Sequence, residues 1–189
     1  TAHKLHGPKG IGALCVRREP RLGLVPLQFG GGQERGLRSG PLPTHQIVGC
    51  GSAYRIARES MGVEIPRIAG LREQLWRSLA AIPGVELNGD PVRRVAGILN
   101  VTVDGVEGET LLLALADLAL SSGSACASLN AEPSYVLRAL GRSDRLAQSS
   151  LRLSLGRFTT SGEVEQAGSR IRAEIVRLRA GEPRSGACP

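Results

Sequence analysis

Three residues near the start of the chain could act together on a carbonyl compound. In TAHKLHGPKG, residues 1–10, Lys4 stands before a Gly-Pro turn and follows Thr1 and His3. A lysine amine can form a Schiff base, and hydroxyl and imidazole groups beside it can hold a phosphate. Spacing alone favours a simpler interpretation, an exposed lysine in a basic turn. A cofactor site at Lys4 therefore needs support from the rest of the sequence.

A second candidate site is the loop GGGQERGLRSG, residues 30–40. Consecutive glycines allow the backbone to come close to a ligand, and Arg35 and Arg38 could both reach an anion. A solvated loop explains the same composition equally well. The sequence contains no GxxxxGK[ST] motif, so a nucleoside-triphosphate loop is not supported.

A third candidate is Cys126, which lies among small polar residues in SSGSACASL, residues 121–129. A nucleophilic cysteine must be exposed and must lose its proton near neutral pH, and such surroundings permit both. We therefore favour a functional role for Cys126 over a buried, inert one. By contrast, Cys15 in an apolar run and Cys50 on a helix are expected to be core residues. The three histidines show no metal-like spacing, which argues against a metal site.

The segments that must position these residues are a mixture of helices and strands. The apolar run 10–16 predicts a strand. Apolar residues at helical spacing predict two helices, over 44–62 and 67–82, separated by Met61-Gly62 and Pro66. The remaining segments are predicted as strands over 85–87, 98–103 and 150–155 and as helices over 107–117, 134–140 and 161–178.

Composition limits the classes of partner. The net charge is +7, from 24 Lys+Arg against 17 Asp+Glu, but the arginines are dispersed at spacings typical of solvated helix faces, as in Arg67, Arg72 and Arg77. A nucleic-acid partner is therefore not expected. No apolar run approaches the roughly 20 residues that span a bilayer, so no membrane partner is expected either. The four cysteines form no CxxC pair, which favours a reducing, cytoplasmic location.

Taken together, the motifs resemble those of one family in order and interval. AHKLHGPKGIGAL, GGGQERGLRSG, SSGSACAS, EPSYVLRALG and SSLRLSLGRFTT are similar to motifs of the cysteine desulfurases, in the housekeeping iron-sulfur-cluster branch. These are fold-type I pyridoxal-phosphate (PLP) enzymes of the class V aminotransferase group. The resemblance extends from residue 1 to about residue 179.

This resemblance implies an α/β fold in several parts. Residues 1–43 would be the end of a fold-type I PLP-transferase large domain, and residues 44–62 a connecting helix. Residues 63–179 would form a small C-terminal α/β domain, followed by a disordered tail over 180–189. The family's first half would lie before residue 1, so the chain is expected to be incomplete and to have little or no activity by itself.

The resemblance also implies roles for individual residues. Lys4 would bind pyridoxal 5′-phosphate covalently and move protons on the substrate carbon, while Thr1 and His3 would hold the cofactor phosphate. Arg152 would pair with the substrate carboxylate, because a guanidinium group binds a carboxylate through two bonds. Cys126 would take sulfur from L-cysteine as a persulfide and release L-alanine, and it could also serve as a transient iron-sulfur ligand.

Partners follow from the same resemblance. A homodimer is expected for the parent enzyme, with an iron-sulfur scaffold or sulfur-acceptor protein as a further partner. At position 41 the family usually has a threonine that contacts the cofactor phosphate of the neighbouring subunit, whereas Pro41 offers neither a hydroxyl nor an amide proton. Two alternatives therefore stay open: a non-catalytic small-domain remnant, and a related selenocysteine lyase or other class V aminotransferase.

Overall fold

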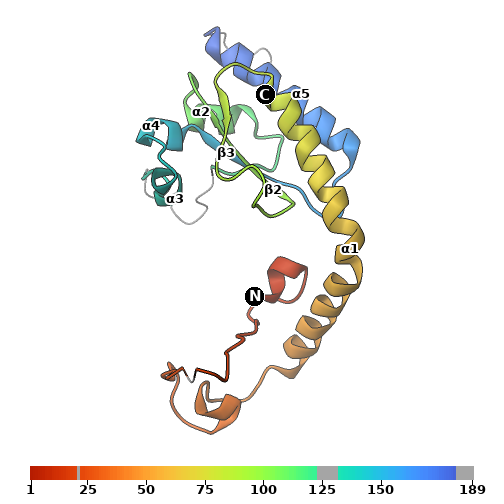
Figure 1. Ribbon diagram of the computed structural model, residues 1–189, viewed down its shortest axis with the longest axis vertical. Helices are drawn as coiled ribbons and strands as arrows, with labels where there is room; N and C mark the ends of the chain where they lie inside the picture. The colour runs from red at the N-terminus through yellow and green to blue at the C-terminus, as the bar shows by residue number, and fades with distance from the viewer. Residues whose placement is uncertain (21, 123–131, 182–189) are drawn as a thin grey trace, which may run out of the picture. The chain divides into compact units, whose positions relative to one another are not determined.

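The computed structural model describes residues 1–20, 22–122 and 132–181. The chain divides into two compact units, 1–62 and 63–189. The first unit holds two short 3₁₀ helices, η1 (Ala2–Leu5) and η2 (Gln33–Gly36). The long helix α1 (Thr44–Ala80) begins in the first unit and ends in the second (Figure 1).

In the first unit, the turn that follows η1 packs closely against α1. Ala2 is fully buried, and a Cβ built at Gly7 would lie 3.0 Å from the Cβ atoms of both Ala2 and Ala53. A Cβ built at Gly49 would lie 2.6 Å from the Cγ of Pro8. Small residues on both sides of the contact are therefore what allow the turn and the helix to approach.

The predicted strand over 10–16 does not form. Residues 11–17 form no regular secondary structure, and Leu14 is 81% exposed. A strand needs a hydrogen-bonded neighbour, and no such neighbour pairs with this segment in the described part of the chain. Cys15 is consequently exposed, so its assignment to the core was wrong, whereas Cys50 is buried on α1 as expected.

The two predicted helices are one. α1 continues through both Gly62 and Pro66, although a proline lacks the N–H of the helix ladder and crowds the carbonyl four residues earlier. Contacts on either side of Pro66 support the continuous helix. Glu64 forms an ion pair with Arg157, and the Arg67 guanidinium donates to the carbonyl oxygens of residues 156, 157 and 159. These tertiary contacts outweigh the local stop signal.

The second unit is built on a three-stranded antiparallel sheet. Its strands are β1 (Val85–Leu87), β2 (Ile98–Val103) and β3 (Ser150–Ser154), in the order β1-β2-β3. All three strands were predicted, two from short β-prone stretches and β3 from alternating polar and apolar residues, and β3 ends one residue earlier than predicted. Because cross-strand partners share a face, the register places Leu99, Val101 and Val103 of β2 on one, apolar face, and Asn100 and Thr102, together with Ile98, on the other, mainly polar face.

The described part of this unit contains four further helices. The predicted helices correspond to α2 (Gly108–Ala114), α3 (Tyr135–Ala139) and α5 (Ser161–Arg179). The fourth, α4 (Asp144–Gln148), was not predicted. Its signal is the N-cap, since the Ser143 hydroxyl accepts from the backbone N–H of Leu146.

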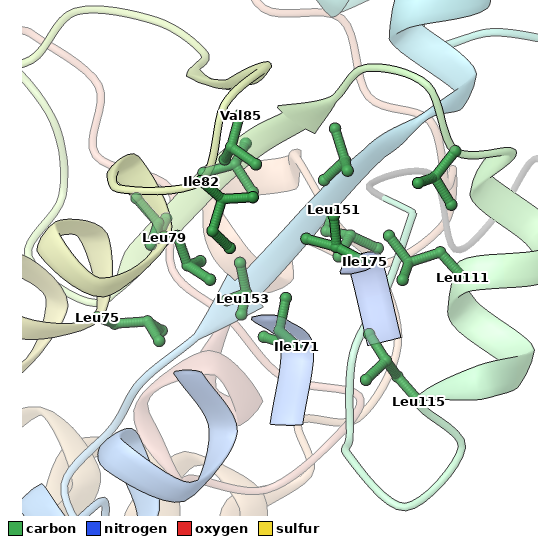
Figure 2. Close-up of a cluster of buried hydrophobic side chains, with 14 of the residues drawn as sticks. Leu75, Leu79, Ile82, Val85, Leu111, Leu115, Leu151, Leu153, Ile171 and Ile175 are labelled. Atoms are coloured by element: carbon green, nitrogen blue, oxygen red, sulfur yellow. The ribbon is translucent and has the colours of Figure 1, made fainter. Parts of the chain in front are cut away.

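The hydrophobic core lies between the apolar face of the sheet and the helices α1, α2 and α5. Figure 2 shows Leu151 and Leu153 of β3 meeting Ile171 and Ile175 of α5. The predicted apolar stripe of α1 is confirmed, and it joins the same core through Leu71, Leu75, Leu79 and the following Ile82. A Cβ built at Gly168 would lie 2.6 Å from the Ser78 hydroxyl oxygen, so α5 crosses α1 closely at this glycine.

No helix in the described part of the chain is long and apolar enough to cross a membrane.

Candidate active site

The Lys4 turn is held firmly while its lysine stays exposed. Lys4 lies in η1, and the buried Ala2 anchors the turn through a backbone bond of 3.0 Å from its N–H to the carbonyl of Ile11. The Thr1 hydroxyl and the His3 Nδ1 are 3.1 Å apart. The turn closes on His6, which adopts left-handed backbone angles (φ 62°). Thus Thr1, His3 and Lys4 are neighbours on one short, exposed helical turn.

This group of residues fits the cofactor that the sequence implies. Among the described residues, the Lys4 side chain has no hydrogen-bonding or ionic partner, so its amine remains available for a carbonyl group. A hydroxyl and an imidazole beside it offer donors suited to a phosphate. The glycine at position 12 keeps space next to Thr1, since a Cβ there would lie 3.1 Å from the Thr1 Cα.

The glycine-arginine loop is ordered by its own hydrogen bonds. The Ser39 hydroxyl donates to the carbonyls of Gln28 and Phe29, and the Gln33 side chain accepts from the Gly40 N–H. The Arg38 Nη1 faces the carbonyls of residues 39, 40 and 41 at 3.1–3.4 Å. Arg38 therefore stabilises the loop itself. Arg35 is exposed with left-handed backbone angles (φ 59°), so it is the better placed of the two arginines to meet an anion.

Pro41 lies at the exposed end of this loop, just before α1. Its carbonyl oxygen is one of those that face Arg38. In the described part of the chain, residue 41 therefore contributes to the loop through its backbone carbonyl, which accepts from Arg38.

Arg152 lies in the second unit, on the polar face of the sheet. It is half-buried at the centre of β3, and Asn100 of β2 is its cross-strand partner. On its other side, Arg152 forms a β-bridge with Ser121, with a bond of 2.7 Å from the Arg152 N–H to the Ser121 carbonyl. Both neighbours fix the backbone of Arg152, which sets the direction in which its side chain leaves the sheet.

Cys126 lies outside the described residues, within 123–131. The chain on both sides of that segment is attached to the sheet. Ser121 pairs with β3, and α3 leads into a link whose Arg142 contacts the end of β1.

Sequence reasoning missed a buried polar cluster beside Arg152. It contains Asn88, Thr102 and Ser150, which are 5%, 1% and 0% exposed, together with Asn100 and Arg142. Asn88 follows β1 in a stretch that reads as a turn. The available signal was the alternation in ILNVTV, which places Asn100 and Thr102 on the face opposite three apolar residues.

Most of the helix arginines are exposed, as the sequence predicted, but several of them also hydrogen-bond to the protein. Arg67 and Arg72 on α1 and Arg172 and Arg179 on α5 donate to backbone carbonyl oxygens of neighbouring segments. Of the three arginines named from the sequence, Arg67 and Arg77 are exposed and Arg72 is half-buried; Arg77 pairs with Glu73 on the same helix. The positive charge of the second unit is thus used largely for internal hydrogen bonds.

Comparison with known proteins agrees with this architecture. The chain matches the family described as Aminotransferase class-V over residues 1–167. A protein described as Cysteine desulfurase IscS, from Cronobacter sakazakii, is 58% identical over 179 residues, which cover 95% of this chain and 44% of that protein. A solved NifS-like protein gives a TM-score of 0.78 at 33% identity, over 94% of this chain and 45% of that one. The structure described as SspA in complex with cysteine gives 0.60 at 32% identity, over 85% and 44%.

The fold and the Lys4 turn together define part of a fold-type I PLP enzyme. The chain belongs to the aminotransferase class-V family, whose members use PLP, and its resemblance to the cysteine desulfurases is confirmed. It spans a little under half the length of the curated relatives that it matches.

Proposed function

We propose that this chain supplies part of the active site of a PLP-dependent cysteine desulfurase, which converts L-cysteine to L-alanine and an enzyme persulfide. The observation that carries the proposal is the exposed, unpaired Lys4 on a rigid turn beside Thr1 and His3, in a chain 58% identical to a cysteine desulfurase. The structure described as SspA in complex with cysteine supports the choice of substrate.

The first unit supplies the cofactor-binding residues. Lys4 holds the cofactor through its amine and later moves a proton on the substrate α carbon, while the Thr1 hydroxyl and the His3 imidazole bind the phosphate. Bound PLP supplies an electron sink for bonds to that carbon. Arg35 is a further candidate for an anion in the same unit, whereas Arg38 keeps its loop in shape.

The second unit supplies the substrate-binding and sulfur-accepting residues. Arg152 pairs with the carboxylate of L-cysteine. The Cys126 thiolate attacks the substrate sulfur, so that a sulfur–sulfur bond forms as the bond between that sulfur and the substrate Cβ breaks. The electron pair of the broken bond stays with the substrate, and its Cβ takes up a proton to become the methyl group of alanine. Alanine then leaves and Cys126 keeps the sulfur as a persulfide, so no external oxidant is needed.

The partners of the whole enzyme belong to the same proposal. We assign residues 1–43 to the end of the PLP-binding large domain, 44–62 to a connecting helix and 63–179 to the small domain. The enzyme acts as a homodimer and delivers sulfur to an acceptor or iron-sulfur scaffold protein, with Cys126 as a transient ligand. Exposed apolar side chains in the first unit, such as Leu27 (94%) and Phe29 (81%), support a further protein contact there. A cytoplasmic location stays a prediction.

A chimera tests the proposal directly. Residues 1–179 of this chain replace the matching 44% of the Cronobacter sakazakii relative, and sulfide and L-alanine are measured with L-cysteine as substrate. We expect activity comparable to that of the relative. Lys4→Ala should remove cofactor absorbance and activity, and Cys126→Ser should remove sulfur transfer. Lys9→Ala, on the same basic turn, is the control and should change neither.

Two results would contradict the proposal. One is a folded chimera that releases alanine from cysteine no faster than free PLP does. The other is a Lys4→Ala variant that keeps both the cofactor absorbance and the activity. A preference for selenocysteine over cysteine would favour the selenocysteine lyase alternative.

A further inference from the structure

The polar face of the sheet aligns two hydrogen-bond donors side by side. In the register of β2 and β3, Asn100 lies directly opposite Arg152. Residues paired in this way have Cβ atoms about 4.5–5.5 Å apart. An asparagine amide and an arginine guanidinium at this spacing can both reach one small ligand.

The orientation of the Asn88 amide is set by Arg142. The Arg142 Nε lies 2.7 Å from the Asn88 Oδ1. A guanidinium can only donate hydrogen bonds, so the Asn88 atom that faces it must be the oxygen. Arg142 is itself fixed by an ion pair with Glu86 and by a bond of 3.0 Å to the carbonyl of Leu87.

The orientation of Asn88 then determines that of Asn100. With its oxygen toward Arg142, Asn88 presents its Nδ2 to the Asn100 Oδ1 at 2.7 Å, and Nδ2 also lies 2.9 Å from the Thr102 hydroxyl. The oxygen of Asn100 is thereby occupied. Its Nδ2 keeps two N–H groups, for which no acceptor is present among the described residues.

We propose that Asn100 is a second residue that binds the substrate carboxylate, next to Arg152, and that Asn88 is a positioning residue that turns the Asn100 amide so that its N–H groups face that carboxylate. The inference rests on the proposed function, in which Arg152 binds the carboxylate of L-cysteine. A carboxylate has two oxygens with about four acceptor positions, so it can take two bonds from the guanidinium and one from the amide. Two neighbouring hydrogen-bond donors therefore favour a substrate that has a carboxylate over a substrate that lacks this group.

Substitution of Asn100 separates this role from a structural one. In the chimera, Asn100→Ala should raise the KM for L-cysteine roughly 10-fold, as expected for a lost hydrogen bond to a charged group, with kcat changed less than about twofold. The inhibition constant of L-alanine, which keeps the carboxylate, should rise by a similar factor. That of cysteamine, which has the amine and thiol but no carboxylate, should stay the same. Ile98→Ala, on the same strand and face, is the control and should alter neither constant.

Substitution of Asn88 tests the positioning. Asn88→Asp keeps an acceptor for Arg142 but replaces the donor that faces Asn100. The Asn100 amide should then reverse, with its N–H groups toward Asp and its oxygen toward the substrate. We expect the KM for L-cysteine to rise at least as much as in Asn100→Ala. In the double variant Asn88→Asp, Asn100→Ala the KM should be no higher than in Asn100→Ala alone, because no amide remains to reverse.

The outcomes distinguish this inference from the proposed function. If Arg152→Ala weakens the binding of L-cysteine and L-alanine while Asn100→Ala weakens the binding of neither, Asn100 does not bind the carboxylate. The inference then fails while the proposed function stands. If Asn100→Ala weakens the binding of cysteamine as much as that of L-alanine, the effect of the substitution is structural and the inference also fails. If Arg152→Ala changes no binding constant, the carboxylate site of the proposed function is wrong.

Discussion

At the residue scale, the structure is organised by groups that can only donate or only accept hydrogen bonds. Several arginines, for example, donate to backbone carbonyl oxygens in loops, where no strand or helix supplies a partner. Arg67 donates to the carbonyl of Thr159, in the segment after β3, and Arg179 donates to that of Pro83, just after α1. Glu174 on α5 is the acidic counterpart. It is 6% exposed and lies between Arg170 and Arg177. Burial acts to raise the pKa of Glu174, but the hydrogen bonds from these two arginines outweigh it and hold that pKa below its usual range.

Removing the charge of Glu174 should therefore destabilise the chain. Glu174→Gln leaves two arginines facing a neutral amide, and we expect the free energy of unfolding to fall by about 1–3 kcal/mol. Urea unfolding followed by circular dichroism measures the change. Glu73→Gln is the matched control, since its pair with Arg77 is exposed and should contribute no more than about 0.5 kcal/mol. Equal losses in the two variants would contradict the role assigned to Glu174.

The pH dependence of this difference has a definite sign. A carboxylate whose pKa is lowered by folding stabilises the folded state fully above the pKa of the unfolded chain, about 4.3 for glutamate. That stabilisation disappears as the pH falls through the lower value of the folded state. The gap in unfolding free energy between the wild-type chain and Glu174→Gln should thus be constant near pH 7 and shrink below about pH 4.3. A gap that widens on acidification would show that Glu174 is not stabilised as a carboxylate.

At the element scale, the contact between α1 and the turn that carries Lys4 depends on glycines, which have no side chain to keep the two segments apart. Gly49 faces the Pro8 ring, whereas Gly51, two residues along the same helix, faces open space. The same substitution at these two positions should therefore have opposite effects. The contact matters because it positions the turn on which Lys4 lies.

We predict that Gly51→Ala stabilises the chain and Gly49→Ala does not. Alanine improves helix propensity by about 0.5–1 kcal/mol over glycine in either place. At Gly49 the added Cβ would approach the Pro8 Cγ to 2.6 Å, so the turn must shift. Thermal unfolding measures the first effect, and PLP absorbance of the chimera measures displacement of the turn. A stabilised Gly49→Ala variant with unchanged PLP binding would show that the contact is not required.

A second prediction at this scale concerns the start of α5. The Thr160 hydroxyl accepts from the Glu163 N–H, and the Glu163 carboxylate accepts from the Thr160 N–H at 2.8 Å, which forms a capping box. Thr160→Ala should lower the free energy of unfolding by about 1 kcal/mol. Thr160→Ser keeps the hydroxyl and should lose far less. If the alanine and serine variants are equally stable, the cap does not contribute.

At the scale of the whole molecule, the two units differ in how completely they bury their apolar side chains. The second unit encloses a core that includes Leu79, Leu99 and Ile171, each at most 1% exposed. The segment 14–29 of the first unit instead exposes several large apolar side chains, among them Leu14, Val25, Leu27 and Phe29. Exposed apolar surface of this kind promotes association.

We therefore predict that the chain associates in solution. Light scattering should report particles larger than a monomer of 19.9 kDa. The double substitution Leu27→Ser, Phe29→Ser should shift the distribution toward the monomer, because both side chains are more than 80% exposed. Val92→Ser, which is 82% exposed in the other unit, is the control and should have little effect. A monodisperse wild-type monomer would contradict the prediction.

The sequence by itself determined the elements whose signal is local. The alternation in β3, the apolar residues at helical spacing in α1 and the amphipathic pattern of α5 each involve residues that are close together in the sequence. These strands and helices could therefore be predicted from the sequence. The motif around Lys4 likewise predicted an exposed lysine between Thr1 and a Gly-Pro turn.

The tertiary structure decided what depends on contacts between distant residues. Whether Pro66 ends a helix depends on Glu64 and Arg67 finding partners more than 85 positions away. Whether residues 10–16 form a strand depends on a neighbour to pair with. Likewise, Asn88 reads as a turn residue until the sheet brings it against Asn100 and Arg142, because hydrogen bonds across strands are set by register and leave no trace in local spacing.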